Sequence, residues 1–322
     1  MIMLRIGITA SGGGHTGYAV SIAQRLSGKA DIVFFVPTGD RWTISKVERY
    51  GRYSEIIKPR GPNESFSKIL YGLPKAMIQS LRSVKDIDVF ISTGSNHSVA
   101  PAIAAWTRRI PVINIESSVR FTRPSATAKH LSRIADLTVI QWEEQKKILS
   151  RGVVFGPLYE LPEHKVENRG YILVTAGTYG FKKLFDSIVV LDIDNVVLQT
   201  GRVDPRIYIE KKPKWVVFDY DPEFSRWIAG ASLVIAHLGK TVIDSALTYR
   251  KPTIIVPNPE WRLTAGAEDA KILASKLGIC YQEDLSPDSL REAIEICRKK
   301  QPIQYKDGSE ELARYILDKY SR

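Results

Sequence analysis

Three glycines followed by a histidine, at residues 12–15, are the residues of this chain that point most directly to chemistry. They stand between an apolar stretch at residues 4–9 and an amphipathic stretch at residues 17–26. Glycine lets the backbone approach a ligand closely, and a helix start offers unpaired N–H groups to an anion. We therefore expect a phosphate site here, with Gly13, Gly14 and Thr16 as ligands. His15 places a group that titrates near neutrality beside that phosphate.

A second loop of the same kind follows a later apolar stretch. Gly94, Ser95 and Asn96 come after residues 89–92 and precede a helical pattern at residues 98–107. Their N–H groups would form another helix start that can receive an anion. The alternative is an ordinary turn in which Ser and Asn cap the helix. Together with the first loop, these residues predict a diphosphate site.

Two side chains are candidates for a catalytic base. His15 would need only a modest pKa adjustment to accept a proton from a hydroxyl, and its alternative role is to cap the loop. Glu116 directly follows the apolar residues 112–115, so it should share the carboxyl edge of the sheet with the glycine loops. It would act as a base or orient His15, or else bond to the turn at Ser117 and Ser118.

Both halves of the chain alternate apolar strands with helical patterns. The strand patterns cover residues 4–9, 32–36, 54–57, 89–92, 112–115 and 137–140, then 171–175, 196–199, 215–218, 233–236 and 253–256. Continuous Ile, Val and Phe runs indicate parallel strands that are buried on both faces. Residues 156–169 are rich in Pro, Glu and Lys, which indicates a linker. We expect an α/β chain of two Rossmann-like, doubly wound parallel-sheet domains, at residues 1–160 and 161–322.

The second half carries its own candidate loops for a phosphorylated ligand. Gly177 and Thr178 follow one strand, Phe218 ends another, and a third leads into His237, Gly239, Lys240 and Thr241. Asp244 would lie on the next helix, where an acid in this kind of fold reaches ribose hydroxyls. Lys240 would neutralise charge on a leaving diphosphate, and backbone groups near Phe218 would hold a base. His237 has the alternative of a strand-end histidine bonded to backbone.

Metal chemistry is not expected from this sequence. Asp219 and Asp221 form an Asp-Tyr-Asp that looks like the Asp-x-Asp of metal-dependent glycosyltransferases. The motif lies between Phe218 and Pro222, which indicates a loop at a strand end. We assign no metal and no cofactor.

The charge and composition of the chain limit the kinds of molecule that we expect it to bind. The chain has 322 residues and a formal net charge of +11. Residues 1–162 contain 22 Lys and Arg against 12 Asp and Glu, which makes +10, whereas residues 163–322 contain 24 against 23, which makes +1. A basic first half favours an anionic partner: a membrane surface or a polyphosphate. No nucleic-acid-binding motif is present, and no apolar run reaches the length of a spanning helix.

Several motifs, taken in order, resemble a known group of enzymes. GITASGGGHTG, STGSNHSVAPAIAAW, PVINIESSVRF and ADLTVIQWEEQ resemble the membrane-recruiting subunit of the eukaryotic chitobiosyl-lipid synthase. YILVTAGT, ASLVIAHLGKTVIDSALTYRKPTIIVPN and AEDAKILASKLG resemble its catalytic subunit. The bacterial lipid II synthase is similar along its whole length. Glu268 and Asp269 fall where the catalytic subunit has sugar-binding residues, and Lys240 replaces a small residue.

The resemblance implies a GT-B glycosyltransferase whose two domains face a cleft. It implies an inverting transfer of GlcNAc from UDP-GlcNAc to a polyprenyl- or dolichyl-diphosphate-linked GlcNAc, the second sugar of an N-glycan lipid precursor. It also implies a peripheral enzyme on the cytoplasmic face of the membrane. The first domain would then bind the acceptor and the membrane, and the second would bind the UDP-sugar.

A stripe of apolar residues at helical spacing is where we expect the chain to contact the membrane. Its members are Phe66, Ile69, Leu70, Leu73, Met77, Ile78 and Leu81, with Lys68, Lys75, Arg82 and Lys85 beside them. An apolar face with basic neighbours suits shallow insertion among anionic headgroups. The alternative is an amphipathic helix that packs on its own sheet.

Other functions fit parts of the pattern. Gly12, Gly14 and Gly17 also match the dinucleotide fingerprint of a dehydrogenase, but the second strand ends without the acid that binds ribose. A UDP-GlcNAc epimerase of the same fold would use the same donor without an acceptor. A non-catalytic recruiting protein would lack a nucleotide site.

Overall fold

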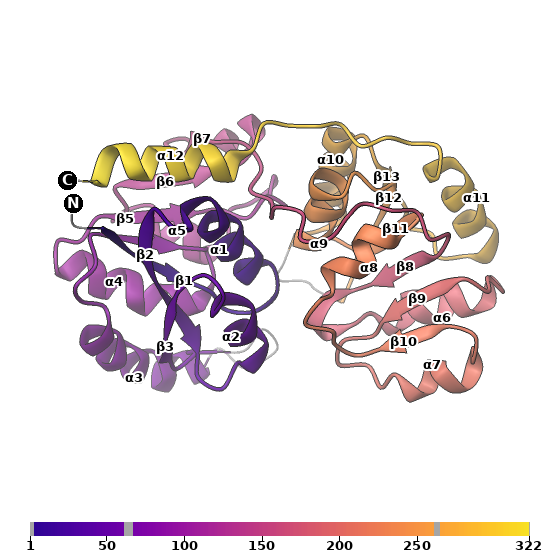
Figure 1. Ribbon diagram of the computed structural model, residues 1–322, viewed down its shortest axis with the longest axis horizontal. Coiled ribbons are helices and arrows are strands. Elements are labelled where there is room, and N and C mark those ends of the chain that lie inside the picture. The colour runs from indigo at the N-terminus through magenta and orange to yellow at the C-terminus, as the bar shows by residue number, and fades with distance from the viewer. Residues whose placement is uncertain (1–2, 61–66, 261–264, 322) are drawn as a thin grey trace. The chain divides into compact units, whose positions relative to one another are not determined.

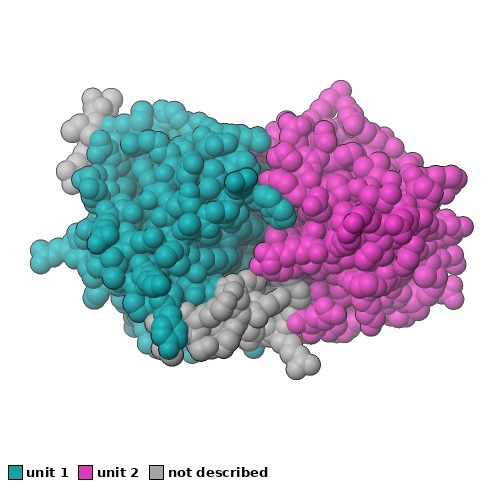
Figure 2. Space-filling model, turned by 90° about the horizontal axis from the view of Figure 1, so that it is seen from below, with its two compact units in different colours: residues 1–160, 306–322 teal, residues 161–305 magenta. Residues whose placement is uncertain are grey.

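Residues 3–60, 67–260 and 265–321 are described by the computed structural model of the chain. Two compact units divide it: Met1–Glu160 with Lys306–Arg322 form unit 1, and Leu161–Tyr305 form unit 2. Figure 2 colours the two units separately.

Unit 1 is built on a parallel sheet. Its described residues form seven strands in the order β3-β2-β1-β4-β5-β6-β7. The strands are β1 (Leu4–Thr9), β2 (Ala30–Pro37), β3 (Arg52–Ile56), β4 (Val89–Ser92), β5 (Val112–Ile115), β6 (Leu137–Ile140) and β7 (Val153–Val154). The helices are α1 (Gly13–Leu26), α2 (Arg41–Val47), α3 (Ser67–Ser83), α4 (Val99–Thr107), α5 (Ala126–Leu131) and α12 (Gly308–Tyr320). Figure 1 shows them around the sheet.

Alternation along the strands explains why this sheet is covered on both faces. Phe34 of β2 packs in the cluster that includes α1 and α12, while the next residue, Phe35, packs in the cluster that includes α4. Successive strand residues point to opposite faces, so a run of apolar residues buries both. The continuous apolar runs of the sequence therefore predict this sheet correctly.

The order of the strands fixes where a ligand can bind in unit 1. β1 pairs with β2 on one side and with β4 on the other, so the chain winds in opposite directions from these two strands. Doubly wound sheets bind ligands at the carboxyl ends of the strands at this switch point. The loops after β1 and β4 are those that carry His15 and Gly94.

Unit 2 repeats the architecture. Its described residues form six parallel strands in the order β10-β9-β8-β11-β12-β13, so β8 and β11 flank the switch point. The strands are β8 (Ile172–Thr175), β9 (Val196–Gln199), β10 (Val216–Phe218), β11 (Leu233–His237), β12 (Thr253–Val256) and β13 (Cys280–Tyr281). The helices are α6 (Lys182–Val190), α7 (Arg206–Lys211), α8 (Ser225–Gly230), α9 (Lys240–Ile243), α10 (Ala267–Leu277) and α11 (Pro287–Cys297).

The predicted fold class is confirmed, since every strand expected from the apolar runs is present. The sequence patterns missed β7 and β13, which have two residues each and are too short to show periodicity. They also started α1 at residue 17, whereas the helix begins at Gly13.

The last helix lies on unit 1, although the sequence prediction extends the second domain to residue 322. Leu312 and Ile316 of α12 are buried in the same core as α1. Arg25 of α1 donates to Asp307, the N-cap of α12, with 3.0 Å between Nε and Oδ2. The amphipathic face of α12 thus completes unit 1, so the chain passes from unit 1 to unit 2 and returns.

Helix α3 differs from the expected membrane stripe. Leu73 and Met77 are partly buried and pack against the core under α3 and α4, which agrees for these two side chains with the alternative of a helix that packs on its own sheet. Among the described side chains of α3, the exposed large apolar ones are Tyr71, Ile78 and Leu81. Phe66 and the side chains of Lys68 and Leu70 lie outside the described residues.

We predict that Asp307→Ala lowers the free energy of unfolding by about 3 kcal/mol, because it removes a helix cap and leaves the buried Arg25 without its carboxylate. Urea denaturation followed by circular dichroism measures the loss. Glu311→Ala is the matched control, since Glu311 pairs with Arg314 on the exposed face of the same helix and should change stability by less than about 0.5 kcal/mol. Equal effects of the two variants would contradict this account of how α12 is held.

Candidate functional site

The first glycine loop forms the start of α1. Gly12 is the N-cap with φ of 83°, and Gly13 follows with φ of 52°, values that favour glycine. The N–H of Gly12 donates to Thr16 Oγ1 at 2.9 Å, so the hydroxyl of Thr16 holds the loop together. His15 is therefore in the first turn of the helix, where backbone N–H groups remain available to an anion.

His15 joins the loops of β1 and β4. Its Nδ1 lies 2.6 Å from the carbonyl oxygen of Thr93. A carbonyl only accepts, so Nδ1 carries the proton and Nε2 keeps its lone pair. Gly94 has φ of 90°, and a Cβ there would lie 3.9 Å from His15 Cε1 and 2.6 Å from the carbonyl oxygen of Ile115. A glycine is therefore required at position 94, where the backbone passes close to the imidazole of His15.

The surroundings of His15 keep it neutral. Burial lowers its pKa to about 4, and the charges of Lys58 and Arg120 act in the same direction, although the bond to Thr93 opposes them. The shift is larger than the modest adjustment expected from the sequence. At physiological pH the ring is already deprotonated at Nε2, as a general base must be.

The other predicted acceptor residues hold the loops in place. Ser95 Oγ receives a hydrogen bond from Ser11 Oγ at 2.6 Å, which ties the β4 loop to the β1 loop. Asn96 Nδ2 donates to the carbonyl oxygen of Arg60 at 2.8 Å. The structure therefore brings the two predicted glycine loops together at one switch point.

Sequence reasoning missed Lys58. Its Nζ donates to the carbonyl oxygen of Ser11 at 3.1 Å, directly at the first glycine loop. The signal was present, because Lys58 follows the strand pattern of β3 and so lies at the carboxyl edge that the glycine loops share.

Glu116 is held by the backbone. It is fully buried, its Oε1 accepts from the N–H of Ser117 at 2.7 Å, and its Oε2 accepts from the N–H of Ser125 at 2.7 Å. Burial raises its pKa, while these two bonds and the charge of Arg120 lower it. Both oxygens are occupied within its own loop, so the geometry favours the alternative of a loop-positioning residue over that of a base.

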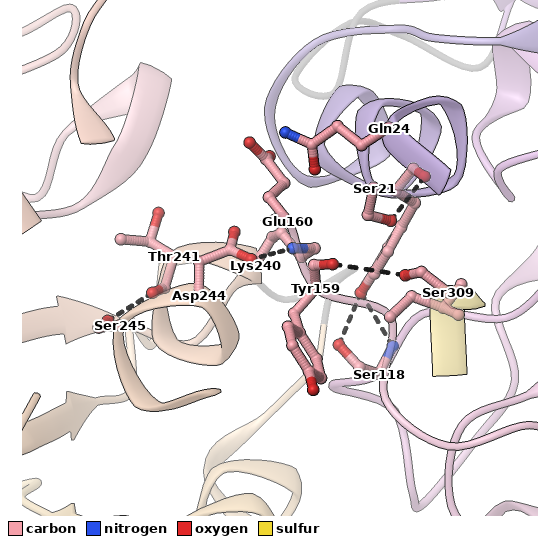
Figure 3. A network of polar contacts seen from close by, with 12 residues as sticks. Ser21, Gln24, Ser118, Tyr159, Glu160, Lys240, Thr241, Asp244, Ser245 and Ser309 are labelled. Atoms are coloured by element: carbon pink, nitrogen blue, oxygen red, sulfur yellow. Dashed lines mark hydrogen bonds and ion pairs between the residues drawn. The ribbon is translucent and has the colours of Figure 1, made fainter. Parts of the chain in front are cut away.

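Side chains from α1 and from the segment after β6 fix the loop after β5. The hydroxyl of Tyr18, from α1, accepts from the N–H of Ser118 at 3.0 Å, and Ser118 is labelled in Figure 3. Trp142 Nε1 donates to the carbonyl oxygen of Ser118 at 2.8 Å. Gln145 Nε2 donates to the carbonyl oxygen of Arg120 at 2.8 Å. This network holds the loop that carries Arg120.

In unit 2, His237 packs between two glycine loops. A Cβ on Gly177, whose φ is 65°, would lie 3.2 Å from His237 Cε1, and a Cβ on Gly239 would lie 3.4 Å from its Nε2. Burial lowers the pKa of His237 to about 4, so the ring is neutral. The predicted donor loops after β8 and β11 therefore meet at the switch point of this sheet.

Lys240 and Asp244 bind each other. Lys240 Nζ donates to Asp244 Oδ1, and both side chains are largely buried. A π-helical turn, Asp244–Thr248, follows α9, and Ser245 Oγ donates to the carbonyl oxygen of Thr241 at 2.5 Å (Figure 3). Two residues that the sequence assigns to different parts of a donor thus form one ion pair.

The remaining predicted donor residues have structural contacts. Asp269 is buried and caps α10, since its Oδ2 accepts from the N–H of Gly266 at 2.9 Å, whereas its neighbour Glu268 is exposed. Phe218 stacks on Trp227 with ring centroids 5.5 Å apart. Asp221 accepts from Trp227 Nε1 at 2.7 Å. Within the described residues, no three His, Cys, Asp or Glu side chains gather into a group that could hold a metal ion.

The loop after β9 contacts one of the predicted donor loops, and the sequence analysis did not include it. A Cβ on Gly201 would lie 2.3 Å from the carbonyl oxygen of Gly177, so the two loops touch through backbone. The N–H of Arg202 donates to the carbonyl oxygen of Thr178 at 3.0 Å, and its guanidinium lies 4.6 Å from the ring centroid of Tyr179.

Comparison with known proteins finds similarity to sugar transferases. Residues 171–318 match the Glycosyltransferase family 28 C-terminal domain. A UDP-N-acetylglucosamine–N-acetylmuramyl-(pentapeptide) pyrophosphoryl-undecaprenol N-acetylglucosamine transferase of Caldicellulosiruptor saccharolyticus is 26% identical over 90% of this chain and 88% of its own length. The enzyme of the same name from a Sulfurihydrogenibium species is 24% identical over 91% and 89%. The prediction of a glycosyltransferase is confirmed.

Solved structures agree on the fold. Acinetobacter baumannii MurG has a TM-score of 0.64 at 18% identity, with 98% of this chain and 99% of that chain covered. A UDP-GlcNAc 2-epimerase of Methanocaldococcus jannaschii also has a TM-score of 0.64, at 14% identity, with 98% and 100% covered. The predicted GT-B architecture is thus confirmed, while the resemblance to the eukaryotic synthase stays a prediction.

We predict that Lys240→Met and Asp244→Asn each lower the free energy of unfolding by about 3–5 kcal/mol, because each leaves one buried group without its partner. The double variant should recover most of that stability. If the pair also binds the donor, the double variant should still bind UDP about 10–100-fold more weakly, measured by calorimetry. A stable double variant with unchanged UDP affinity would limit the pair to a structural role.

Proposed function

We propose that this chain transfers GlcNAc from UDP-GlcNAc to a sugar linked through a diphosphate to a polyprenyl or dolichyl lipid, with inversion and without a metal. The matches to family 28 and to the named transferases support the donor and the lipid-linked acceptor. The observation that carries the proposal is His15: a neutral imidazole at the switch point, with Nε2 available beside the first turn of α1.

We propose that these groups act together in one reaction. The hydroxyl of the acceptor sugar attacks the anomeric carbon of GlcNAc, its proton passes to His15 Nε2, and the bond to the UDP oxygen breaks. The N–H groups at the start of α1 and in the loop after β4 would hold the acceptor diphosphate. In unit 2 the Gly177 and Gly239 loops would hold the donor diphosphate, with Lys240 offsetting the charge of the leaving group.

Two versions of the proposal differ in the sugar of the lipid-linked acceptor. The sequence resemblance predicts GlcNAc, whereas the named bacterial relatives use an N-acetylmuramyl-(pentapeptide) lipid. Purified protein should be incubated with UDP-GlcNAc and each lipid diphosphate in turn, with and without EDTA, and the products identified by mass spectrometry. A new disaccharide lipid formed in EDTA supports the proposal.

Two other outcomes would replace the proposal. Conversion of UDP-GlcNAc without any acceptor would identify an epimerase. Absence of both turnover and UDP binding would identify a recruiting protein. Activity that is lost in EDTA and restored by Mg²⁺ or Mn²⁺ would remove the metal-independent mechanism.

His15→Gln should lower kcat by about two to four orders of magnitude while UDP affinity changes less than about twofold, because the base acts only on the chemical step. Steady-state kinetics measure kcat, and calorimetry measures the affinity for UDP. His130→Gln is the matched control, as His130 is an exposed histidine on α5 of the same unit. Normal turnover in His15→Gln would remove His15 from the mechanism.

We also propose that unit 1 docks on the cytoplasmic face of an anionic membrane. Among the described residues no helix is both long and apolar enough to span a bilayer. Helix α3 exposes Tyr71 and Ile78, which are 78% and 53% exposed. Arg108 donates to the carbonyl oxygen of Leu81, so the end of α4, with the exposed Trp106, lies beside the end of α3. Lys75, Arg82 and Lys85 are exposed on the same helix or just after it.

Replacing Tyr71, Ile78 and Trp106 by Ser should release the protein from anionic vesicles without lowering its melting temperature, since these side chains are exposed. Removing Lys75, Arg82 and Lys85 should also release it, at about 1 kcal/mol of binding per charge. Leu73→Ser with Met77→Ser is the contrast pair, and it should lower the melting temperature because both side chains pack in the core. Co-sedimentation of the folded triple-Ser variant at the level of the unchanged protein would place the docking surface elsewhere.

A further inference from the structure

The side chain of Thr9 holds the residue whose carbonyl oxygen orients His15. Thr9 is the last residue of β1 and is fully buried, as is Thr93. The N–H of Thr93 donates to Thr9 Oγ1 at 3.1 Å, and Thr93 Oγ1 donates to the carbonyl oxygen of Thr9 at 2.9 Å. Two reciprocal bonds therefore fix both the backbone and the side chain of Thr93.

These bonds lie where the backbone pairing of β1 with β4 has ended. The last paired residues are Ile8 and Ile91, and Thr93 lies one residue beyond the end of β4. A buried backbone N–H needs an acceptor, and the acceptor for the N–H of Thr93 is the side-chain oxygen of Thr9. The side chain of Thr9 thus continues the connection between the two strands into the loop that contacts His15.

The same hydroxyl also reaches the far end of the β4 loop. Thr9 Oγ1 donates to the carbonyl oxygen of Ile91 at 3.3 Å and lies 2.7 Å from Ser98 Oγ. Ser98 is fully buried and ends the short helical turn Asn96–Ser98 that precedes α4. One buried hydroxyl therefore holds the loop of residues 93–98 at its beginning and at its end.

We propose that Thr9 is a positioning residue for the transfer reaction: through Thr93 it holds His15 in the orientation and tautomer in which Nε2 accepts the proton of the acceptor hydroxyl. This inference rests on the proposed function, because it concerns the base proposed there. Thr9 acts through Thr93, since its side chain is buried beneath the loops and has no surface to offer a substrate.

The geometry explains why the position of Thr93 matters to the base. Only 2.6 Å separate His15 Nδ1 from the carbonyl oxygen of Thr93, so a shift of this carbonyl moves or releases the ring. A general base must come within about 3 Å of the proton that it takes. A misplacement of about 1 Å can lower the rate about 100-fold, which makes the support of Thr93 relevant to kcat.

Two variants separate the hydroxyl of Thr9 from its bulk. Thr9→Val keeps a β-branched side chain of similar shape and removes the hydroxyl, whereas Thr9→Ser keeps the hydroxyl and removes a methyl group. Thr253→Val is the matched control: Thr253, the first residue of β12, is also fully buried, and its hydroxyl donates to the carbonyl oxygen of Lys251 at 2.8 Å. Thr93→Val is a milder second variant, because it removes only the bond from Thr93 Oγ1 to Thr9.

The decisive measurement is the tautomer of His15, observed by NMR of protein labelled with ¹⁵N-histidine. Near neutral pH the ring is uncharged, since burial lowers the pKa of His15 to about 4. The unchanged protein, Thr9→Ser and Thr253→Val should carry the proton on Nδ1, whereas Thr9→Val should populate the tautomer with the proton on Nε2. The signal that disappears in His15→Gln identifies His15 among the five histidines of the chain.

The kinetics should follow the tautomer. Thr9→Val should lower kcat at least about tenfold, and Thr9→Ser should stay within about threefold of the unchanged protein. The acceptor KM and the affinity for UDP should change less than about twofold in both variants, because Thr9 contacts no ligand. Thermal melts of every variant establish that it is folded, and they compare the stability lost in Thr9→Val with that lost in Thr253→Val.

A folded Thr9→Val protein with the proton of His15 still on Nδ1 and with unchanged kcat would overturn the inference. So would an equal loss of kcat in Thr9→Val and Thr253→Val without any change of tautomer, because Thr9 would then act on stability alone. If Thr9→Val does not fold, Thr93→Val provides the same test with a smaller expected effect. Failure of the proposed function looks different: the unchanged protein would have no turnover on any lipid diphosphate, while the tautomer comparison would still decide whether Thr9 positions His15.

Discussion

The bond between His15 Nδ1 and the carbonyl oxygen of Thr93 is the interaction on which the candidate site depends. It joins the loop after β1 to the loop after β4, and these strands are neighbours because the winding of the sheet reverses between them. It also settles the tautomer of the ring, because a carbonyl oxygen can only accept. One contact therefore connects the topology of the sheet to the protonation state of the proposed base.

Unit 2 has the same sheet topology as unit 1 but holds its positive charge differently. Its histidine, His237, also sits at the switch point between glycine loops and is also neutral. In this unit, however, a lysine and an aspartate on the following helix pair with each other. In unit 1 the cation near the histidine is Lys58, which is bonded to a backbone carbonyl. The two units thus share a scaffold and differ in how positive charge is held.

Apolar periodicity was enough to predict the strands and the two-domain fold, because strands buried on both faces leave a continuous pattern. It could not predict that α12 returns to unit 1, since the pairing of Arg25 with Asp307 joins residues far apart in sequence. The glycine loops were found from sequence because only glycine suits their backbone. The role of Glu116 was not found from sequence, because a carboxylate at a strand end can either face a ligand or accept two backbone N–H groups. A single lysine carries no periodic signal, so Lys58 could have been found only from its place directly after the strand pattern of β3.

The return of α12 has a consequence for biosynthesis. Unit 2 is one continuous stretch, so all of its strands have been made before the last helix is synthesised. Unit 1 contains β1, which is made before every strand of unit 2, yet part of its core is supplied by Leu312 and Ile316. On a ribosome unit 1 must therefore wait, with this part of its core uncovered, until unit 2 has been made and α12 has emerged. Unit 2 can therefore complete its core before unit 1 does, although most of unit 1 is synthesised first.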